Sequence, residues 1–188
     1  DSVAIDTEAT GLKIPERDKL SLIQLCDASG NVYVIQPDRK TYKAPNLVSI
    51  LEDEKILKIG HFLRFDKNAL EFFLKCKIKN IFDTKIASKV VRTYTDQHGL
   101  KNLVYEFCNK NLDKRAGSSD WNKNINELTD KQLEYAANDV IYLHKIKNEL
   151  EKMLKRENRM DLYQNCITFL DTRIALDQSG FKFDIFEH

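Results

Sequence analysis

Alternation of hydrophobic and polar positions predicts three strands near the start of the chain. Residues 3–8 (VAIDTE) are typical of a buried strand that ends in two carboxylates. Residues 19–26 (KLSLIQLC) alternate as a half-buried strand does, and residues 32–35 follow a Gly30-Asn31 turn as its hairpin partner. Together the three segments predict a small antiparallel meander.

Helical spacing dominates the remainder of the chain, with one more predicted strand at residues 56–59. Asp83 is the predicted N-cap of one helix, and Thr129, with Gln132 at capping-box distance, begins the longest one. Strands followed by helices predict an α/β fold in which helices flank a sheet. Apolar residues at spacings of three and four place the helices after Pro45, around Leu70–Leu74, and over residues 83–94, 100–108, 129–154 and 160–176.

Two segments carry aromatic residues in polar surroundings. Residues 109–124 (NKNLDKRAGSSDWNKN) lack apolar periodicity and predict a mobile surface segment. Trp121 within it either stacks on an aromatic ligand or, more commonly for such a residue, packs in a core or an interface. At the C-terminal end, Phe181, Phe183 and Phe186 either cover a neighbouring subunit or fold back on their own domain.

Composition restricts the class of protein. The 188 residues are 42% hydrophobic and 31% charged, as in ordinary soluble globular proteins, and no apolar run approaches the roughly 18 residues of a membrane span. Lys and Arg number 30 against 29 acids, so no global basic field exists to coat long nucleic acid. Scattered cysteines and the lack of a signal-peptide pattern predict a cytoplasmic protein with no membrane partner, and the start at Asp1 suggests that natural residues precede it.

A pair of carboxylates on one strand is the first chemical signal. Side chains alternate along a strand, so Asp6 and Glu8 point to one side while Ile5 and Thr7 point to the other. Two like charges on one face of a central strand repel each other unless a divalent cation neutralises them. A D-x-E triplet also occurs in solvated turns, so this signal alone leaves both interpretations open.

Two later segments add acids to the pair. Asp66 falls near the first turn of a helix, where a capping or dipole role is the commoner fate. Tyr135 and Asp139 are four residues apart on a helix and share one face. Ligands gather where the strands of an α/β sheet end, so four converging acids could bind two hard cations there. Two metals about 3.5 to 4 Å apart are suited to phosphoryl displacement.

These motifs together resemble the DEDD-type 3′–5′ exonucleases of the tyrosine-containing, ribonuclease D-like group. The resemblance rests on D-x-E at Asp6 and Glu8, R-F-D ending at Asp66, and Y-x-x-x-D at Tyr135 and Asp139. It implies a ribonuclease H-like, DnaQ-like fold with a mixed central sheet. Connecting stretches agree as well, including residues 83–87 (DTKIA), 99–103 (GLKNL), 112–114 (LDK), 119–121 (SDW) and 135–140 (YAANDV).

More narrowly, the chain is similar to the short stand-alone nanoRNase C proteins of alphaproteobacteria. That resemblance includes residues 84–88 (TKIAS), 92–96 (RTYTD) and the closing 184–186 (DIF). It implies hydrolysis of very short RNA, dinucleotides above all, by a ring-shaped homo-oligomer such as an octamer. It also implies one exonuclease domain over residues 1–188, with a core at 1–156 and a C-terminal helix and tail at 157–188 that pack or make oligomer contacts.

Site roles follow from the resemblance, position by position. Asp6, Glu8, Asp66 and Asp139 would hold two Mg²⁺ or Mn²⁺ ions, with Asp6 bridging them. Tyr135 would orient the attacking water, because a phenol with an ordinary pKa near 10 is a poor base at neutral pH.

Substrate contacts are expected around the acids. Leu12, which follows a predicted turn at Gly11, would wedge between two bases, although packing at the strand end is the alternative. Thr7 and His61 are further candidates. Related proteins often read H-N-A-x-F-D where this chain has Phe62 after His61, so a substrate hydrogen bond from position 62 is not expected. Basic candidates for phosphate contacts are Arg92, His98, Lys101 and Lys114.

Three functions remain open from the sequence. The first is a metal-dependent 3′–5′ exoribonuclease that releases nucleoside 5′-monophosphates from very short RNA. The second is a general ribonuclease D-like trimmer of RNA, or an exonuclease that also takes DNA. The third, from another class, is a catalytically silent RNA-binding module, against which the presence of all five catalytic residues argues.

Overall fold

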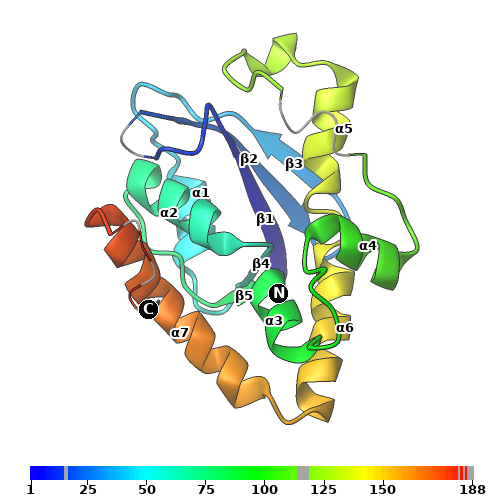
Figure 1. The fold of residues 1–188 in the computed structure, drawn as a ribbon. Coiled ribbons are helices and arrows are strands. Elements are labelled where there is room, and N and C mark those ends of the chain that lie inside the picture. The colour runs from blue at the N-terminus through cyan, green and yellow to red at the C-terminus, as the bar shows by residue number, and fades with distance from the viewer. Residues whose placement is uncertain (15–16, 114–118, 182, 184, 186–188) are drawn as a thin grey trace.

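A mixed five-stranded sheet forms the centre of the molecule (Figure 1). The structure is a computed structural model, and it describes residues 1–188 except 15–16, 114–118, 182, 184 and 186–188. The strand order is β3-β2-β1-β4-β5. The strands are β1 (Ser2–Ala9), β2 (Leu20–Asp27), β3 (Val32–Ile35), β4 (Leu57–Gly60) and β5 (Ile81–Asp83).

The predicted meander is present on one side of the sheet. β1 pairs antiparallel with β2, and β2 pairs antiparallel with β3. On its other side β1 pairs parallel with β4, which pairs parallel with β5. β1 is therefore the central strand, flanked by strands on both sides, and the mixed α/β fold class predicted from the sequence is confirmed.

Helices cover both faces of this sheet. They are α1 (Pro45–Glu52), α2 (Leu63–Leu74), α3 (Thr84–Val91), α4 (Leu100–Cys108), the short 3-10 helix η2 (Ile125–Glu127), α5 (Asp130–Asn138), α6 (Leu143–Arg156) and α7 (Met160–Gln178). Among the described residues, no helix is long and apolar enough to cross a membrane.

The alternation of β1 divides the core into two large clusters. Val3 and Ile5 pack with buried residues of α1 and α2, whereas Ala4 packs on the opposite face with α3, α4 and α6. α7 contributes to both clusters, with Tyr163 in one and Leu170 in the other. Asp6 and Glu8 continue the Ala4 face, so they lie on the side of the sheet that carries α3 to α6.

The sequence pattern predicts one continuous helix over residues 129–154, and this is wrong. The structure has two helices, α5 and α6, separated by a turn over residues 139–142. Bonds three residues apart tighten the chain there, from Val140 N–H to the Ala137 carbonyl and from Leu143 N–H to the Val140 carbonyl. The turn lets α6 pack in the large Ala4 cluster while α5 packs beside a separate small cluster of Leu22, Trp121 and Leu128.

Capping side chains support two of the predicted helix starts. The Asp83 side chain accepts from the backbone N–H groups of Lys85 and Ile86 at the start of α3. Thr129 and Gln132 form the predicted capping box of α5.

Gly11 lies in the predicted turn, and its φ is outside the left-handed region that favours glycine. An added Cβ there would lie 2.4 Å from an oxygen of Asp18, so a larger residue would displace the Asp18 side chain, which accepts a hydrogen bond from the Lys13 N–H at 2.8 Å.

Candidate active site

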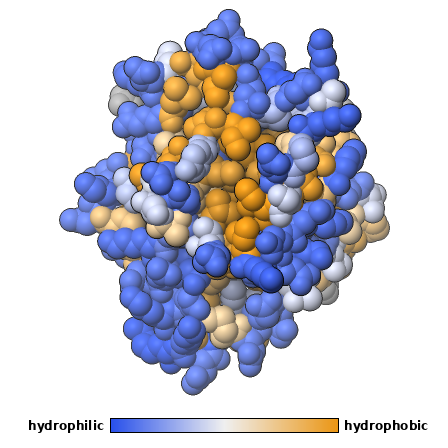
Figure 2. Space-filling model, turned by 180° about the vertical axis from the view of Figure 1, so that it is seen from behind, coloured by the Kyte–Doolittle hydropathy of each residue, from blue (hydrophilic) through white to orange (hydrophobic). Residues whose placement is uncertain are grey.

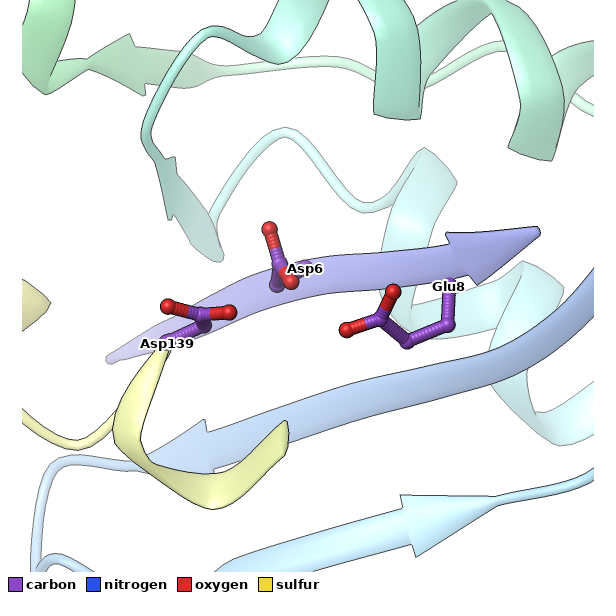
Figure 3. Close-up of side chains that lie close together, drawn as sticks. All are labelled: Asp6, Glu8 and Asp139. Atoms are coloured by element: carbon purple, nitrogen blue, oxygen red, sulfur yellow. The ribbon is translucent and has the colours of Figure 1, made fainter. Parts of the chain in front are cut away.

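Three carboxylates meet beside the end of β1. Asp6, Glu8 and Asp139 each offer one oxygen, and these oxygens all lie within 4.8 Å of one another (Figure 3). The central strand supplies the first two, and Asp139 arrives from the turn that ends α5. Oxygen donors of this kind are the ligands that hard divalent cations prefer, so the donor set fits Mg²⁺ or Mn²⁺.

Asp66 lies in the same cleft but is not a member of this trio. It sits in the first turn of α2, on the face of β1 opposite to Asp6, and its Oδ1 accepts a hydrogen bond of 2.6 Å from the Thr7 hydroxyl. Burial raises the pKa of the Asp66 carboxyl to about 7. The strand alternation that separates Thr7 from Asp6 also explains why Asp66 meets Thr7 rather than the trio.

Tyr135 lies on α5, one turn before Asp139. Burial is the main cause that raises the pKa of its phenol above the usual value, and the nearby charges of Asp139 and Glu8 raise it further. The phenol is therefore protonated at neutral pH, donates its hydrogen bond to the Asp139 side chain, and cannot act as a base. Trp121 is buried and packs against it, with ring centroids 6.1 Å apart. Of the two interpretations of Trp121, the structure shows packing.

His61 also lines the cleft, and its ring proton can be assigned. The Thr84 hydroxyl donates to the Gly60 carbonyl at 2.9 Å, and it also lies 2.9 Å from the His61 Nδ1. A hydroxyl has a single proton, so Nδ1 must be the donor in that second contact. In a neutral ring the Nε2 atom is then an acceptor.

The cleft that contains these groups has a volume of about 350 Å³. Its described lining includes the four acids, Thr7, Tyr135, His61 and the apolar residues Leu12, Phe62, Phe65 and Leu100. Leu12 is 85% exposed, as its position after the predicted turn suggested. A large apolar side chain standing this far into solvent at a cleft is available to a ligand.

Arg92 and His98 do not line the cleft. The Arg92 side chain is buried, where it donates to the Ser88 hydroxyl and the Gln97 carbonyl and forms an ion pair with Glu106. His98 contacts the same Ser88 hydroxyl, and burial is the main cause that lowers its pKa. In this structure both residues fix the segment between α3 and α4, and Arg92 offers no guanidinium to a phosphate in the cleft. Lys101 is exposed on α4, and Lys114 lies outside the described residues.

Lys85 lines the cleft, and sequence reasoning gave it no role. It is the only lysine or arginine among the described lining residues. Its Nζ lies 4.2 Å from the ring centroid of Phe62. The signal was present in the D-T-K-I-A stretch, but a lysine one position after a predicted helix start is usually solvated, so the pattern alone gave it no weight.

A model of the 3′–5′ exonuclease family matches residues 1–155, and the chain belongs to that family. Ribonuclease D of Gluconacetobacter diazotrophicus is 31% identical over 162 residues, which are 85% of this chain and 39% of that protein. DNA polymerase I of Aquifex aeolicus is 33% identical over 159 residues, which are 80% of this chain and 24% of the polymerase. The chain thus spans well under half the length of these relatives.

Among solved structures, Brucella melitensis NrnC is similar over the whole chain. The identity is 46% and the TM-score 0.93, with 100% of this chain and 90% of that chain covered. NrnC has also been solved bound to pGG and with bound Mg²⁺. Escherichia coli RNase D, described as an exoribonuclease involved in structured RNA processing, has 26% identity and a TM-score of 0.79 over 92% of this chain and 44% of its own. The predicted resemblance to ribonuclease D-like exonucleases and to NrnC is confirmed.

Proposed function

We propose that the chain is a metal-dependent 3′–5′ exoribonuclease that hydrolyses very short RNA, dinucleotides above all, to nucleoside 5′-monophosphates. The observation that carries the proposal is the convergence of three carboxylate oxygens within 4.8 Å beside Tyr135 in a chain of the 3′–5′ exonuclease family. The preference for short RNA is supported by the 46% identity to NrnC, whose structure has been solved with pGG.

Four acids are proposed to hold two cations. Asp6, Glu8 and Asp139 are already gathered, and Asp66 faces the same cleft from α2. Bound cations would supply activation of a water molecule and compensation of charge on the leaving oxygen. Tyr135, whose phenol hydrogen-bonds to the Asp139 side chain, would orient that water through its oxygen, since its raised pKa keeps the proton in place.

Leu12 and His61 are the proposed substrate contacts, and Thr7 is proposed to affect substrate binding indirectly. Leu12 would separate the two bases, and the His61 Nε2 would accept a hydrogen bond from a ribose hydroxyl. Thr7 would act through Asp66, because its hydroxyl is already donated to that carboxylate. His98 and Lys101 are still proposed to contact phosphate groups of the substrate, although neither residue is among the described lining of the cleft.

Turnover of 5′-labelled RNAs of two, three, five and about twenty nucleotides, with Mg²⁺, with Mn²⁺ and with EDTA, tests the proposal. We expect EDTA to abolish cleavage and the dinucleotide to be consumed far faster than the rest. Equal trimming of the long RNA would instead establish the ribonuclease D-like alternative, and cleavage of matched DNA would show that the sugar is not discriminated. Binding without cleavage under every metal condition would leave the silent RNA-binding module.

Replacement of Tyr135 by phenylalanine is expected to lower kcat about a hundredfold, because positioning of the reacting water is lost while the metal ligands remain. The aromatic contact with Trp121 is preserved, so the melting temperature should change little. Steady-state kinetics on a dinucleotide, together with thermal unfolding, provide the check. An unchanged kcat would remove Tyr135 from the catalytic set.

The protein is proposed to form a homo-oligomer and to act in the cytoplasm. Figure 2 shows apolar side chains gathered in a broad band on the face opposite to that of Figure 1. Exposed large apolar residues include Tyr33, Leu162 and Phe183, and Phe181 contacts Phe183 with ring centroids 5.7 Å apart, while Phe186 lies outside the described residues. The four cysteines are free thiols, which fits a reducing compartment. The C-terminal helix α7 is proposed to contribute contacts between subunits, and the mass in solution tests the assembly.

A further inference from the structure

Phe62 is an unusual residue at the mouth of the cleft. The residue is 46% exposed although it carries a large aromatic group, and it belongs to the cleft lining. Its backbone has φ 68°, in the left-handed region that residues other than glycine and asparagine adopt rarely. An exposed aromatic ring in an unfavourable backbone conformation contributes little to the fold, so its place beside the acids points to a role in binding.

The surrounding structure holds Phe62 in this conformation. The buried Asp83 carboxylate accepts from the N–H groups of Phe62 at 3.3 Å and Leu63 at 2.7 Å. The same carboxylate accepts from Lys85 N–H at 2.8 Å and Ile86 N–H at 3.0 Å. One side chain therefore caps the N-termini of both α2 and α3, and it fixes Phe62 and Lys85 relative to each other.

Lys85 occupies one face of the Phe62 ring. Its Nζ lies 4.2 Å from the ring centroid, within the range of a cation–π contact. The ammonium group covers one face of the ring, and the residue as a whole remains 46% exposed in the lining of the cleft. It is also the only lysine or arginine among the described residues around four acids, so it counters part of their repulsion toward an anionic substrate.

From these contacts we propose that Phe62 is a stacking platform for a nucleobase of the substrate, with Lys85 as its support on the opposite face. The inference rests on the proposed nuclease function and adds a binding determinant to it. Every base has an aromatic face, so such a platform binds without regard to sequence and favours substrates whose bases are unpaired.

The test is a double-mutant cycle in which one change removes the Phe62 ring from the protein and the other removes a base from the substrate. Phe62→Leu keeps an apolar side chain and removes the aromatic face. Wild type and variant are compared on pGG and on the two analogues that lack either the 5′ or the 3′ base. We expect KM for pGG to rise about tenfold in the variant with little change in kcat. With the analogue that lacks the stacked base, wild type and variant should give the same KM, and this analogue identifies which base is bound.

A matched control exists on the same helix. Lys75 lies 4.2 Å from the ring centroid of Phe72, in the same kind of contact, and neither residue is among the described lining of the cleft. Phe72→Leu should leave KM for pGG unchanged. Phe62→Asn provides a second readout, because asparagine tolerates the left-handed conformation. We expect this variant to melt at the same or a higher temperature than wild type while its KM rises about tenfold.

Two results would overturn the proposal. In the first, Phe62→Leu raises KM by the same factor for pGG and for both analogues, which would show a purely structural effect. The other is an unchanged KM in both Phe62 variants. Either result is distinct from failure of the nuclease function, in which wild type itself would not cleave pGG. Affinity for pGG measured with Ca²⁺ in place of the activating metal gives the same comparison without turnover.

Discussion

Replacement of Asp139 by asparagine is expected to lower kcat/KM on a dinucleotide about a thousandfold, equivalent to about 4 kcal/mol of transition-state stabilisation. Asparagine keeps the size of the side chain and removes its charge. One of the three gathered carboxylates is thereby lost as a cation ligand. Without a cation these carboxylates repel one another, so the variant should unfold in EDTA at the same or a higher temperature than wild type.

Metal-dependent thermal unfolding separates this effect from misfolding. A cation that binds only the folded state raises the melting temperature, and wild type should show this rise with Mn²⁺ while Asp139→Asn shows much less of it. Asp130→Asn is the matched control, because Asp130 is an exposed acid in the first turn of the same helix. Full activity in Asp139→Asn would rule out our assignment of the metal ligands.

The second large effect is expected from Asp83→Ala, which should lower the free energy of unfolding by about 3 to 4 kcal/mol. Four backbone N–H groups, those of Phe62, Leu63, Lys85 and Ile86, donate to this buried carboxylate. Alanine leaves all four donors unsatisfied at the starts of two helices. Urea denaturation monitored by circular dichroism measures this loss of stability. The comparison is valid if the dependence of the unfolding free energy on urea concentration is the same in variant and wild type.

Thr129→Ala gives the scale for a single helix cap. Thr129 caps only α5, so its loss should cost about 1 kcal/mol. If Asp83→Ala cost no more than Thr129→Ala, the shared cap of α2 and α3 would not hold in solution. The activity of Asp83→Ala should also fall, because Phe62 and Lys85 lose their common anchor.

Local patterns predicted most of the fold. Alternation identified β1, β2 and β3, and capping signals at Asp83 and Thr129 identified two helix starts, because these features depend on a few neighbouring residues. The strand β5 was missed, since three residues give no periodicity. The turn between α5 and α6 was also missed. The apolar spacing continues through this turn without interruption. The change in direction is evident only in the fold, where α6 packs in one hydrophobic cluster and α5 packs beside another.

The meeting of three acids was predictable from the sequence, whereas the other contacts in the candidate site were not. Asp6, Glu8 and Asp139 meet as their types and positions suggested. The bond from Thr7 to Asp66 depends on α2 crossing the other face of β1, which no local pattern encodes. Arg92 looks like a surface cation in sequence, but Glu106, fourteen residues later, pairs with it in the fold. Long-range partners therefore decided which of the predicted contacts reach the cleft.

The turn that separates α5 from α6 also has a consequence for the dynamics of the site. α6 is anchored in the large Ala4 cluster, whereas α5 rests on the small cluster of Leu22, Trp121 and Leu128. Local opening of α5 exposes little apolar surface, so it costs less free energy than global unfolding. Such an opening would move Tyr135 and Asp139 away from Asp6 and Glu8 at the same time. On heating, activity should therefore be lost reversibly before the sheet unfolds, and a cation bound between Asp139 and the β1 acids would oppose that loss.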